Sequence, residues 1–272
     1  MRTIPLQTDK KSWRRLLRST PADIIQFILL LVLCCWFFSV SFRGSGYNWQ
    51  WYQIPQYLYT FDEKGFIAGP LLLGLLVTLQ ISAVSLILAF IIGLITALMQ
   101  LSQSFVGRAV ARVYLESIRN TPLLIQLFFI YFVMGPTLGL GRFFSAVLAL
   151  SLFEGAYTSE IIRAGIVSIH RGQWEASYSL GMSIFDTYRS IILPQAFRRI
   201  LPPLASQAIS LVKDSALVST IAIYDLTMQA QAIIAETFLT FEIWFTVALM
   251  YLCITITLSL VVNGLKNRFP SN

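Results

Sequence analysis

The stretch GPLLLGLLVTLQISAVSLILAFIIGLITALMQLS, residues 69–102, decides the fold class of this chain. It lies within a longer interval, residues 65–107, that contains no Lys, Arg, Asp or Glu. About twenty consecutive apolar residues are enough to cross a lipid bilayer as a helix. The segment therefore spans a bilayer with residues to spare. Its apolar residues are continuous instead of alternating, which argues against the strands of a transmembrane β-barrel.

The composition of the whole chain agrees with a membrane protein. Of the 272 residues, 56% are hydrophobic and only 12% are charged, which is about half the charged fraction of an ordinary soluble domain. We predict an all-α integral membrane protein with six transmembrane helices, at about 23–42, 69–100, 121–140, 143–162, 201–222 and 241–262.

The basic residues are distributed unequally between the two sides of these predicted spans. Sixteen of the twenty Lys and Arg residues fall on one side, and Lys213 falls inside a span. The other side has only Arg43, Lys64 and Arg142. Since cytoplasmic loops carry the excess of positive charge, both termini are predicted to be cytoplasmic. The net charge of +7 is thus explained by topology and gives no reason to expect a nucleic-acid partner.

Segments outside the spans have their own composition. The tail 1–22 is basic and amphipathic. It either lies on anionic lipid or only sets the orientation of the chain in the membrane through its positive charge. The loop 43–68 is rich in Trp and Tyr and is predicted to cap the outer membrane interface. Residues 263–272 form a cytoplasmic C-terminal tail. Small residues in the second span predict a closely packed helix: Gly69, Gly74, Thr78, Ser82, Ser85 and Gly93.

A polar interruption, EASYSLGMSIFDTYRSIILP at 175–194, separates two apolar regions. One helix face is predicted to carry Trp174, Tyr178, Met182 and Phe185, with room for close contact at Gly181. Pro194 is expected to limit the helix. A helix resting on lipid would carry more cations than Arg189. We therefore predict a cytoplasmic helix that docks to another protein.

The residues of this interruption also carry a family resemblance. Seven of them resemble the EAA motif, E-A-A-x3-G-x9-I-x-L-P, of permease subunits of ATP-binding-cassette (ABC) importers: Glu175, Ala176, Ser177, Gly181, Ile191, Leu193 and Pro194. Ser177 is the one departure, because the family often has alanine there. The stretches IRNTPLLIQLFFIYF (118–132) and EGAYTSEIIRAGI (154–166) are similar to the polar amino acid permeases of this family, described as binding-protein-dependent transport inner-membrane components.

The resemblance implies an ABC permease domain at 69–262, with a five-helix type I importer core and a cytoplasmic coupling loop at 163–200. It implies two ATPase subunits, a second permease chain (identical or related), a periplasmic solute-binding protein and a polar amino acid as substrate. Such a multi-pass protein belongs in the bacterial inner membrane, in contact with lipid. An ion-coupled secondary carrier or a channel for small polar solutes is the alternative, which the docking loop and the lack of an internal repeat argue against.

Enzymatic function is not expected of this chain. The sequence contains no GxxxxGK[ST] phosphate-binding loop, no HExxH and no GxSxG. ATP hydrolysis is therefore assigned to the partner ATPase, which would bind the ATP and Mg, and this chain is expected to hold no cofactor and no metal.

Ionisable residues within predicted spans are candidates for function, because burying charge in lipid is costly. Those singled out are Glu154, Tyr157, Glu160, Lys213 and Asp214. They either line a path for the ammonium and carboxylate groups of the substrate or stabilise the helices as ion pairs. In the second interpretation Glu160 pairs with Arg163, while Glu154 or Asp214 pairs with Lys213.

Overall fold

A computed structural model describes residues 20–43, 46–62 and 65–268 of the chain. The chain forms two units, Met1–Trp49 and Gln50–Asn272. In the first unit, the described helix is α2 (Thr20–Arg43), which covers the residues of the predicted first span at 23–42. Most of the predicted N-terminal tail, residues 1–19, and the last four residues, 269–272, lie outside the described residues.

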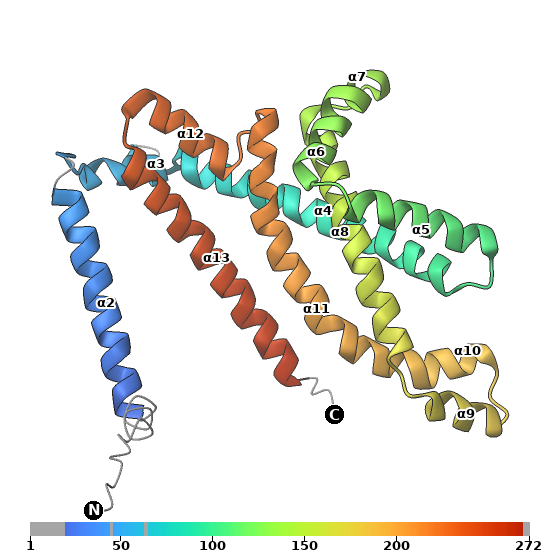
Figure 1. Cartoon of the computed structure of the whole chain (residues 1–272). Helices are drawn as coiled ribbons and strands as arrows, with labels where there is room; N and C mark the ends of the chain where they lie inside the picture. Colours follow the sequence, from blue (N-terminus) through green and yellow to red (C-terminus); the bar gives the residue numbers. More distant parts are fainter. Residues whose placement is uncertain (1–19, 44–45, 63–64, 269–272) are drawn as a thin grey trace, which may run out of the picture. The chain divides into compact units, whose positions relative to one another are not determined.

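The second unit is mostly helical (Figure 1). Its elements in chain order are η1 (Trp51–Gln53), α3 (Ile54–Leu58), β1 (Tyr59–Asp62), β2 (Gly65–Ala68), α4 (Pro70–Leu101), α5 (Phe105–Arg119), α6 (Leu123–Phe128), η2 (Phe129–Met134), α7 (Gly135–Leu138), α8 (Arg142–Val167), α9 (Arg171–Ser179), α10 (Ile184–Thr187), η3 (Tyr188–Ile192), α11 (Leu193–Asp214), η4 (Ser215–Ile221), α12 (Leu226–Thr237) and α13 (Thr240–Arg268).

Two described helices are individually long and apolar enough to cross a bilayer, Pro70–Leu101 and Thr240–Val262. Two bent pairs raise this number to as many as four. The first pair joins α5 to the α6–α7 segment at 106°, and the second joins the segment Ile184–Ile221 to α12 at 48°. The helix α13 continues to Arg268, past the predicted end of the last span at residue 262. The full set of six spans remains a prediction.

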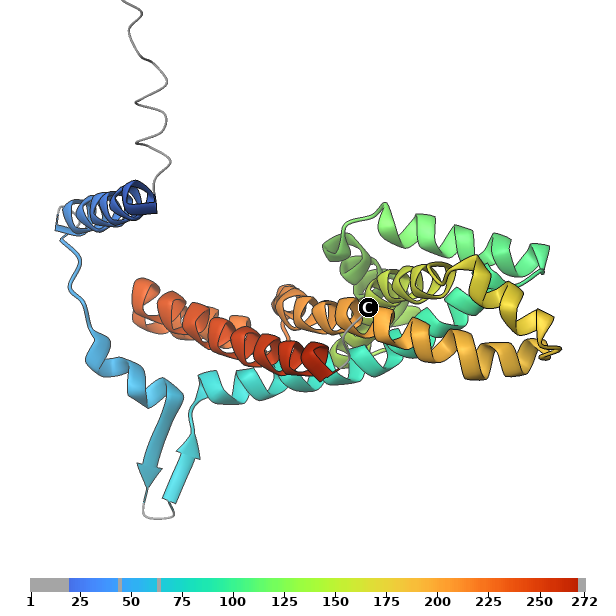
Figure 2. The same ribbon diagram turned by 90° about the horizontal axis from the view of Figure 1, so that it is seen from below.

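The predicted loop 43–68 contains a β-hairpin that the all-α prediction missed. Strands β1 and β2 pair antiparallel, with Phe61 opposite Phe66, and extend away from the helices directly before α4 (Figure 2). The ring centroids of Tyr59 and Phe66 lie 6.1 Å apart, and those of Phe61 and Phe66 lie 6.0 Å apart. Cross-strand aromatic contacts of this kind stabilise a short pair of strands. The hairpin therefore depends on contacts between side chains, which the composition of the loop does not predict.

Close packing of α4 against α8 organises the second unit. A Cβ atom on Gly93 would lie only 2.5 Å from Cγ2 of Thr158 and 3.0 Å from the carbonyl oxygen of Gly155. The hydroxyl of Ser151 donates a 3.3 Å hydrogen bond to the carbonyl of Ser85. The structure thus confirms α4 as a packing helix. Its small residues are buried: Gly69, Gly74, Thr78, Ser82, Ser85 and Gly93.

The apolar core lies in three clusters along these helices. One joins α4, α6 and α8 around Ile81, Leu127 and Leu150. A second joins α4, α12 and α13. The third packs the C-terminal part of α8 against η3 and α11, through residues such as Ile166 and Ile192. This third cluster supports the loop that contains α9 and α10.

We expect Gly93→Ala to destabilise the helical unit, because the added methyl group must displace Thr158 or the backbone of α8. Overpacking of this kind costs about 1–3 kcal/mol. Thermal unfolding of the detergent-purified chain measures the effect. The control is Gly141→Ala, where a Cβ meets no atom within 4 Å and φ is ordinary. Equal melting temperatures for the two variants would contradict the packing argument.

Candidate functional site

The segment with the EAA-like motif forms two helices instead of the one predicted. Helix α9 covers Arg171–Ser179 and α10 covers Ile184–Thr187. Between them Gly181 has φ +73, a backbone conformation that glycine adopts without steric cost. Trp174 and Phe185 therefore do not share one helix face, and that prediction is wrong.

Gly181 is required for the turn and not for close contact. A Cβ atom at this position would meet nothing within 4 Å. Its amide donates a 3.0 Å hydrogen bond to the carbonyl of Tyr178, as does the amide of Met182 to Ser177 at 3.1 Å. Ser183 then caps α10, since its hydroxyl accepts a 3.1 Å hydrogen bond from the amide of Asp186. The chain therefore reverses direction between α9 and α10 within a few residues.

The inner side of this loop is anchored to the spanning helices. Trp174 contacts Tyr188 edge to face at a centroid distance of 5.1 Å and joins the third apolar cluster. Ser177 is buried, and its hydroxyl donates to the carbonyl of Trp174 at 2.8 Å. Ser177 stands at the position where the family often has alanine, and its polar atom is satisfied locally. The departure from the motif is thus compatible with burial.

The outer side of the loop presents exposed apolar side chains. Leu180 is 80% exposed, Ile184 and Phe185 are each 68% exposed, and Tyr178 is 49% exposed. We call these four residues the loop tip. Contiguous exposed apolar residues at a polar rim are typical of a protein–protein contact. The rim includes Glu175, which pairs with Arg171 at 3.1 Å on the exposed face of α9.

Leu180 and Ile184 were not singled out by sequence reasoning. The sequence does contain a signal for them, because Ser183 followed three residues later by Asp186 resembles a helix N-cap. Combined with Gly181, that signal predicts a second helix start. The two apolar residues on either side of the glycine then fall at the tip of a turn.

Pro194 does not limit the helix, contrary to the prediction. The segment from Ile184 to Ile221 is one helical path that includes η3 with π geometry over Tyr188–Ile192. Proline lacks the amide hydrogen that would bond to the preceding turn, and it occupies the first turn of α11, directly after the π segment. Ile191 is half-buried and Leu193 and Pro194 are exposed. The loop is therefore connected to α11 without a flexible break.

A second close contact joins α11 to α8. A Cβ on Gly165 would lie 2.2 Å from Cγ1 of Ile200, so only glycine allows this approach. Arg199 of α11 also donates to the hydroxyl of Ser168 at 3.0 Å. The residues that bracket the loop, at the end of α8 and the start of α11, are held together. In Figure 1, α9 and α10 lie at the end of these helices opposite α12.

The candidate ionisable residues separate into two groups. Glu154 on α8 is 1% exposed, and its Oε1 atom has no hydrogen-bond partner among the described residues. Gln207 and Asp214 of α11 are near enough to interact with this carboxyl group. Lys213 is exposed and is near enough to act electrostatically on Asp214. Within the described part of the chain, no carboxylate lies within 4.0 Å of the Lys213 ammonium group, so the predicted ion pair of Lys213 is not formed.

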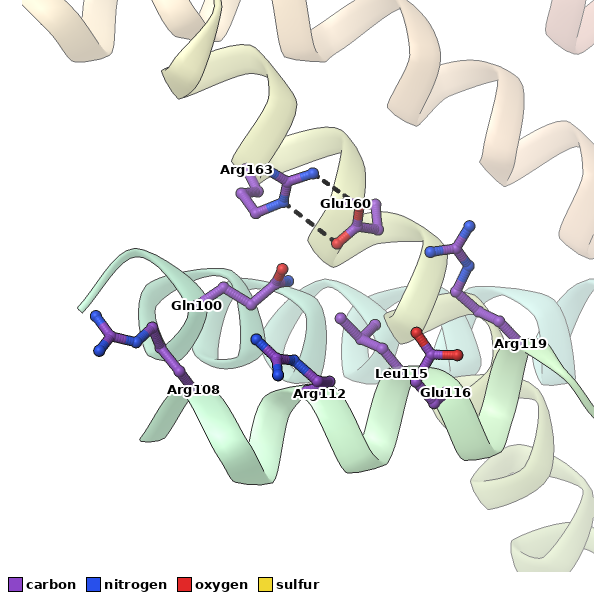
Figure 3. Close-up of a pocket in the computed structure, with 8 residues that line it drawn as sticks. All are labelled: Gln100, Arg108, Arg112, Leu115, Glu116, Arg119, Glu160 and Arg163. Atoms are coloured by element: carbon purple, nitrogen blue, oxygen red, sulfur yellow. Dashed lines mark hydrogen bonds and ion pairs between the residues drawn. The ribbon is translucent and has the colours of Figure 1, made fainter. Parts of the chain in front are cut away.

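The second group lies nearer the loop. Arg163 forms the predicted ion pair with Glu160, with Nη2 3.0 Å from Oε2 (Figure 3). Tyr157 is half-buried between Phe153, at a centroid distance of 5.1 Å, and the guanidinium of Arg119 at 5.9 Å. Glu160 and Tyr157 thus have partners on α8 and α5, while Glu154 faces α11.

The start of α6 has no side-chain cap. Pro122 occupies the N-cap position of α6, directly after Thr121. The hydroxyl of Thr121 instead donates to the carbonyl of Ser117 at 2.8 Å and accepts from Nε2 of Gln126 at 2.9 Å. The side chain of Gln126, five residues further along the chain, therefore occupies the Thr121 hydroxyl.

Comparison with known proteins assigns a family to this arrangement. Residues 89–270 match the family described as binding-protein-dependent transport system inner membrane component. This match covers most of the chain and includes both helices of the loop. The chain belongs to this family.

Similar proteins agree with the match. The glutamine transport system permease protein GlnP of Escherichia coli (strain K12) is 41% identical over 205 residues, which are 74% of this chain and 94% of that protein. The L-cystine transport system permease protein TcyB of Bacillus subtilis (strain 168) is 43% identical over 197 residues, 72% of this chain and 84% of that protein.

Solved structures share the fold. A chain from a crystal structure of an amino acid ABC transporter with histidines is 38% identical, with a TM-score of 0.70 over 73% of this chain and 94% of that chain. An inward-facing structure of the MetNI methionine ABC transporter is 18% identical, with a TM-score of 0.62 over 73% of this chain and 95% of its own. At 18% identity, the similarity to this second structure supports a shared fold and nothing more.

We expect Gly181→Val to disrupt the turn, whereas Gly181→Asn should preserve it. A left-handed conformation costs an ordinary L-residue about 1–2 kcal/mol, and asparagine tolerates it better. Amide hydrogen exchange around Met182 should therefore be about tenfold faster in the valine variant. Equal exchange in the two variants would show that the turn does not depend on the backbone angle of this residue.

Proposed function

We propose that this chain is the transmembrane permease subunit of an ABC importer that carries a polar amino acid across the bacterial inner membrane. ATP hydrolysis in a separate subunit drives the transport. The observation that carries the proposal is the exposed apolar loop tip, held on α8 and α11, in a chain of this family. The glutamine and L-cystine permeases similar to the chain support an amino acid as the substrate.

The proposed topology has six transmembrane helices, with both termini in the cytoplasm and the loop tip on the same side. Helix α2 is the additional N-terminal span, and the second unit supplies the five-helix core. The excess of Lys and Arg on the loop side supports this orientation. Two such chains, identical or related, form the membrane unit with two ATPase subunits, and a periplasmic solute-binding protein delivers the substrate.

The proposed coupling mechanism depends on the rigid connection between the loop and α11. The ATPase subunit binds the loop tip around Leu180 and Phe185. ATP-driven approach of two ATPase subunits then displaces the loops. Because α10, η3 and α11 form one helical path, displacement at the loop moves α11 and, through the Gly165–Ile200 contact, α8. The motif residues Glu175, Ala176, Ser177, Gly181, Ile191, Leu193 and Pro194 form or support this connection.

The proposed substrate path runs along the face of α8 and α11 that contains Glu154. A buried carboxyl group with an unpaired oxygen is a ready partner for the ammonium group of an amino acid. Lys213, which is exposed and has no carboxylate within 4.0 Å among the described residues, is a candidate partner for the substrate carboxylate, and Asp214 is near enough to interact with both Glu154 and Lys213. We assign Tyr157 and Glu160 to the same path but closer to the loop, where Arg119 and Arg163 are their partners.

An ion-coupled carrier or channel is disfavoured as the alternative, because the 38% identical chain of solved structure comes from an amino acid ABC transporter. The deciding experiment is uptake of labelled glutamine and other polar amino acids by proteoliposomes that contain the complete complex. We expect uptake only with internal ATP and the binding protein. Uptake driven by an ion gradient without ATP would overturn the proposal.

We expect the double variant Leu180→Ala/Phe185→Ala to insert normally but to lose the ATPase subunit. Truncating one of the few anchor residues at the centre of an interface costs about 2 kcal/mol or more. Co-purification of the ATPase with the variant measures this loss. The control Phe61→Ala removes an equally exposed ring from β1 and should retain the ATPase. Normal co-purification of the double variant would remove the loop tip from the interface.

We expect Glu154→Gln to raise the KM for the substrate by about tenfold, since a hydrogen bond to a charged group is worth about 1.5–3 kcal/mol. The measurement is the concentration dependence of ATP-driven uptake. Glu236→Gln, the same change at an exposed position of α12, is the control. An unchanged KM and substrate preference in the Glu154 variant would exclude this residue from the path.

A further inference from the structure

A second site lies outside the loop and the Glu154 face, and it shares Glu160 with the end of the proposed substrate path nearer the loop. Helices α4, α5 and α8 line a partly open cavity of about 270 Å³. Its lining is unusually rich in arginine: Gln100, Arg108, Arg112, Leu115, Glu116, Arg119, Glu160 and Arg163. Figure 3 shows Arg112 and Arg119 reaching from α5 toward α4 and α8. We call this cavity the arginine pocket.

The charges in the arginine pocket do not balance. Four guanidinium groups face two carboxylates, which leaves an excess of positive charge. Arg163 is neutralised by Glu160, and one Nη1 donor of Arg108 is used by the carbonyl of Ser102 at 3.1 Å. Arg112 forms no ion pair within the described part of the chain. The pocket is therefore suited to an anion.

A buried hydrogen-bond donor in the same pocket makes no well-formed hydrogen bond. Nε2 of Gln100 has no partner of hydrogen-bonding geometry among the described residues, although the carboxylate of Glu160 is near enough to interact with this side chain. A buried donor without a partner costs about 1–3 kcal/mol, so an acceptor atom there would remove this cost. Phosphate oxygens accept from amides and from arginine forks simultaneously, which makes a phosphate group a good match for this combination of donors.

The surface next to the pocket indicates which kind of molecule would carry the phosphate group. Helix α5 is strongly amphipathic, and the side away from its arginines carries Val106, Val110 and Val113, all exposed. By helical spacing the exposed Phe105 falls between these valines and the arginines, so apolar surface continues around the helix to the edge of the pocket. A molecule with a phosphate head and apolar chains fits both the pocket and this apolar surface. Basic pockets between membrane helices on the cytoplasmic side bind the headgroups of anionic lipids.

We propose that the arginine pocket binds the phosphate headgroup of an anionic phospholipid of the cytoplasmic leaflet, with its acyl chains along the apolar side of α5. The lipid would join α4, α5 and α8 at the end nearer the coupling loop. The proposal is independent of the substrate carried, and it needs only that the loop side of the chain faces the cytoplasm.

Native mass spectrometry of the purified full-length chain with equal amounts of phosphatidylglycerol and phosphatidylcholine tests the proposal. We expect the wild-type chain to retain phosphatidylglycerol preferentially. Arg112→Gln should reduce this preference about tenfold, as expected for loss of one charge-assisted contact. Arg112→Lys should keep part of it. The control Arg198→Gln removes the same charge at an exposed position of α11 outside the pocket and should retain the full preference.

Three results would overturn the proposal. The first is equal retention of the two lipids by the wild-type chain, which requires no variant to fold. The second is an unchanged preference in Arg112→Gln. The third is saturable binding of inorganic phosphate to the chain in phosphatidylcholine nanodiscs, abolished by Arg112→Gln. We expect no such binding, and its observation would assign the pocket to a soluble anion instead of a lipid.

Discussion

Backbone contact between α4 and α8 is the interaction on which the helical unit depends. In a bilayer the surrounding lipid is as apolar as the helices, so no hydrophobic driving force presses one helix against another. Association then relies on short-range dispersion and on hydrogen bonds, both of which require close approach. Gly93 provides that approach by placing the α4 backbone against Thr158 and the carbonyl of Gly155. Helices α5, α6 and α11 also pack on α8.

The same requirement for small residues recurs where motion has to be transmitted. Gly165 lets α11 approach α8 through Ile200, while the third apolar cluster attaches Trp174 to the same helices. A loop attached at both ends to packed helices cannot move independently of them. Under the proposed function, this rigidity explains how an event at a cytoplasmic subunit changes helices within the membrane. The π segment before Pro194 preserves the connection that a proline would otherwise interrupt.

The two carboxylates of α8 differ in the ion-pair and hydrogen-bond partners that surround them. Glu160 lies beside Arg163 on the same helix, and this ion pair offsets the cost of placing both charges near lipid. Glu154 has no such partner and leaves one oxygen unpaired in a buried position. An unsatisfied buried group of this kind is retained when function requires it. The contrast between two carboxylates six residues apart follows from their neighbours on other helices.

Membrane character, the approximate positions of the helices and the motif of the coupling loop follow from the sequence alone, because they depend on composition and spacing within short segments. The Glu160–Arg163 pair was also predictable, since residues three apart lie on one helix face. The turn at Gly181 and the continuation of the helix through Pro194 were not. Each depends on how backbone strain and missing hydrogen bonds are compensated by the surrounding structure.

The tertiary structure alone decided which apolar residues of the loop face inward and which face outward. Trp174 is covered because Tyr188 and the ends of α8 and α11 meet there, whereas Leu180 stays exposed at the tip of a turn. It also decided that arginines from α5 and α8 meet Gln100 of α4 in one pocket. Such sets of neighbours are fixed by helix crossings, and hydropathy along a single chain carries no information about which helices cross.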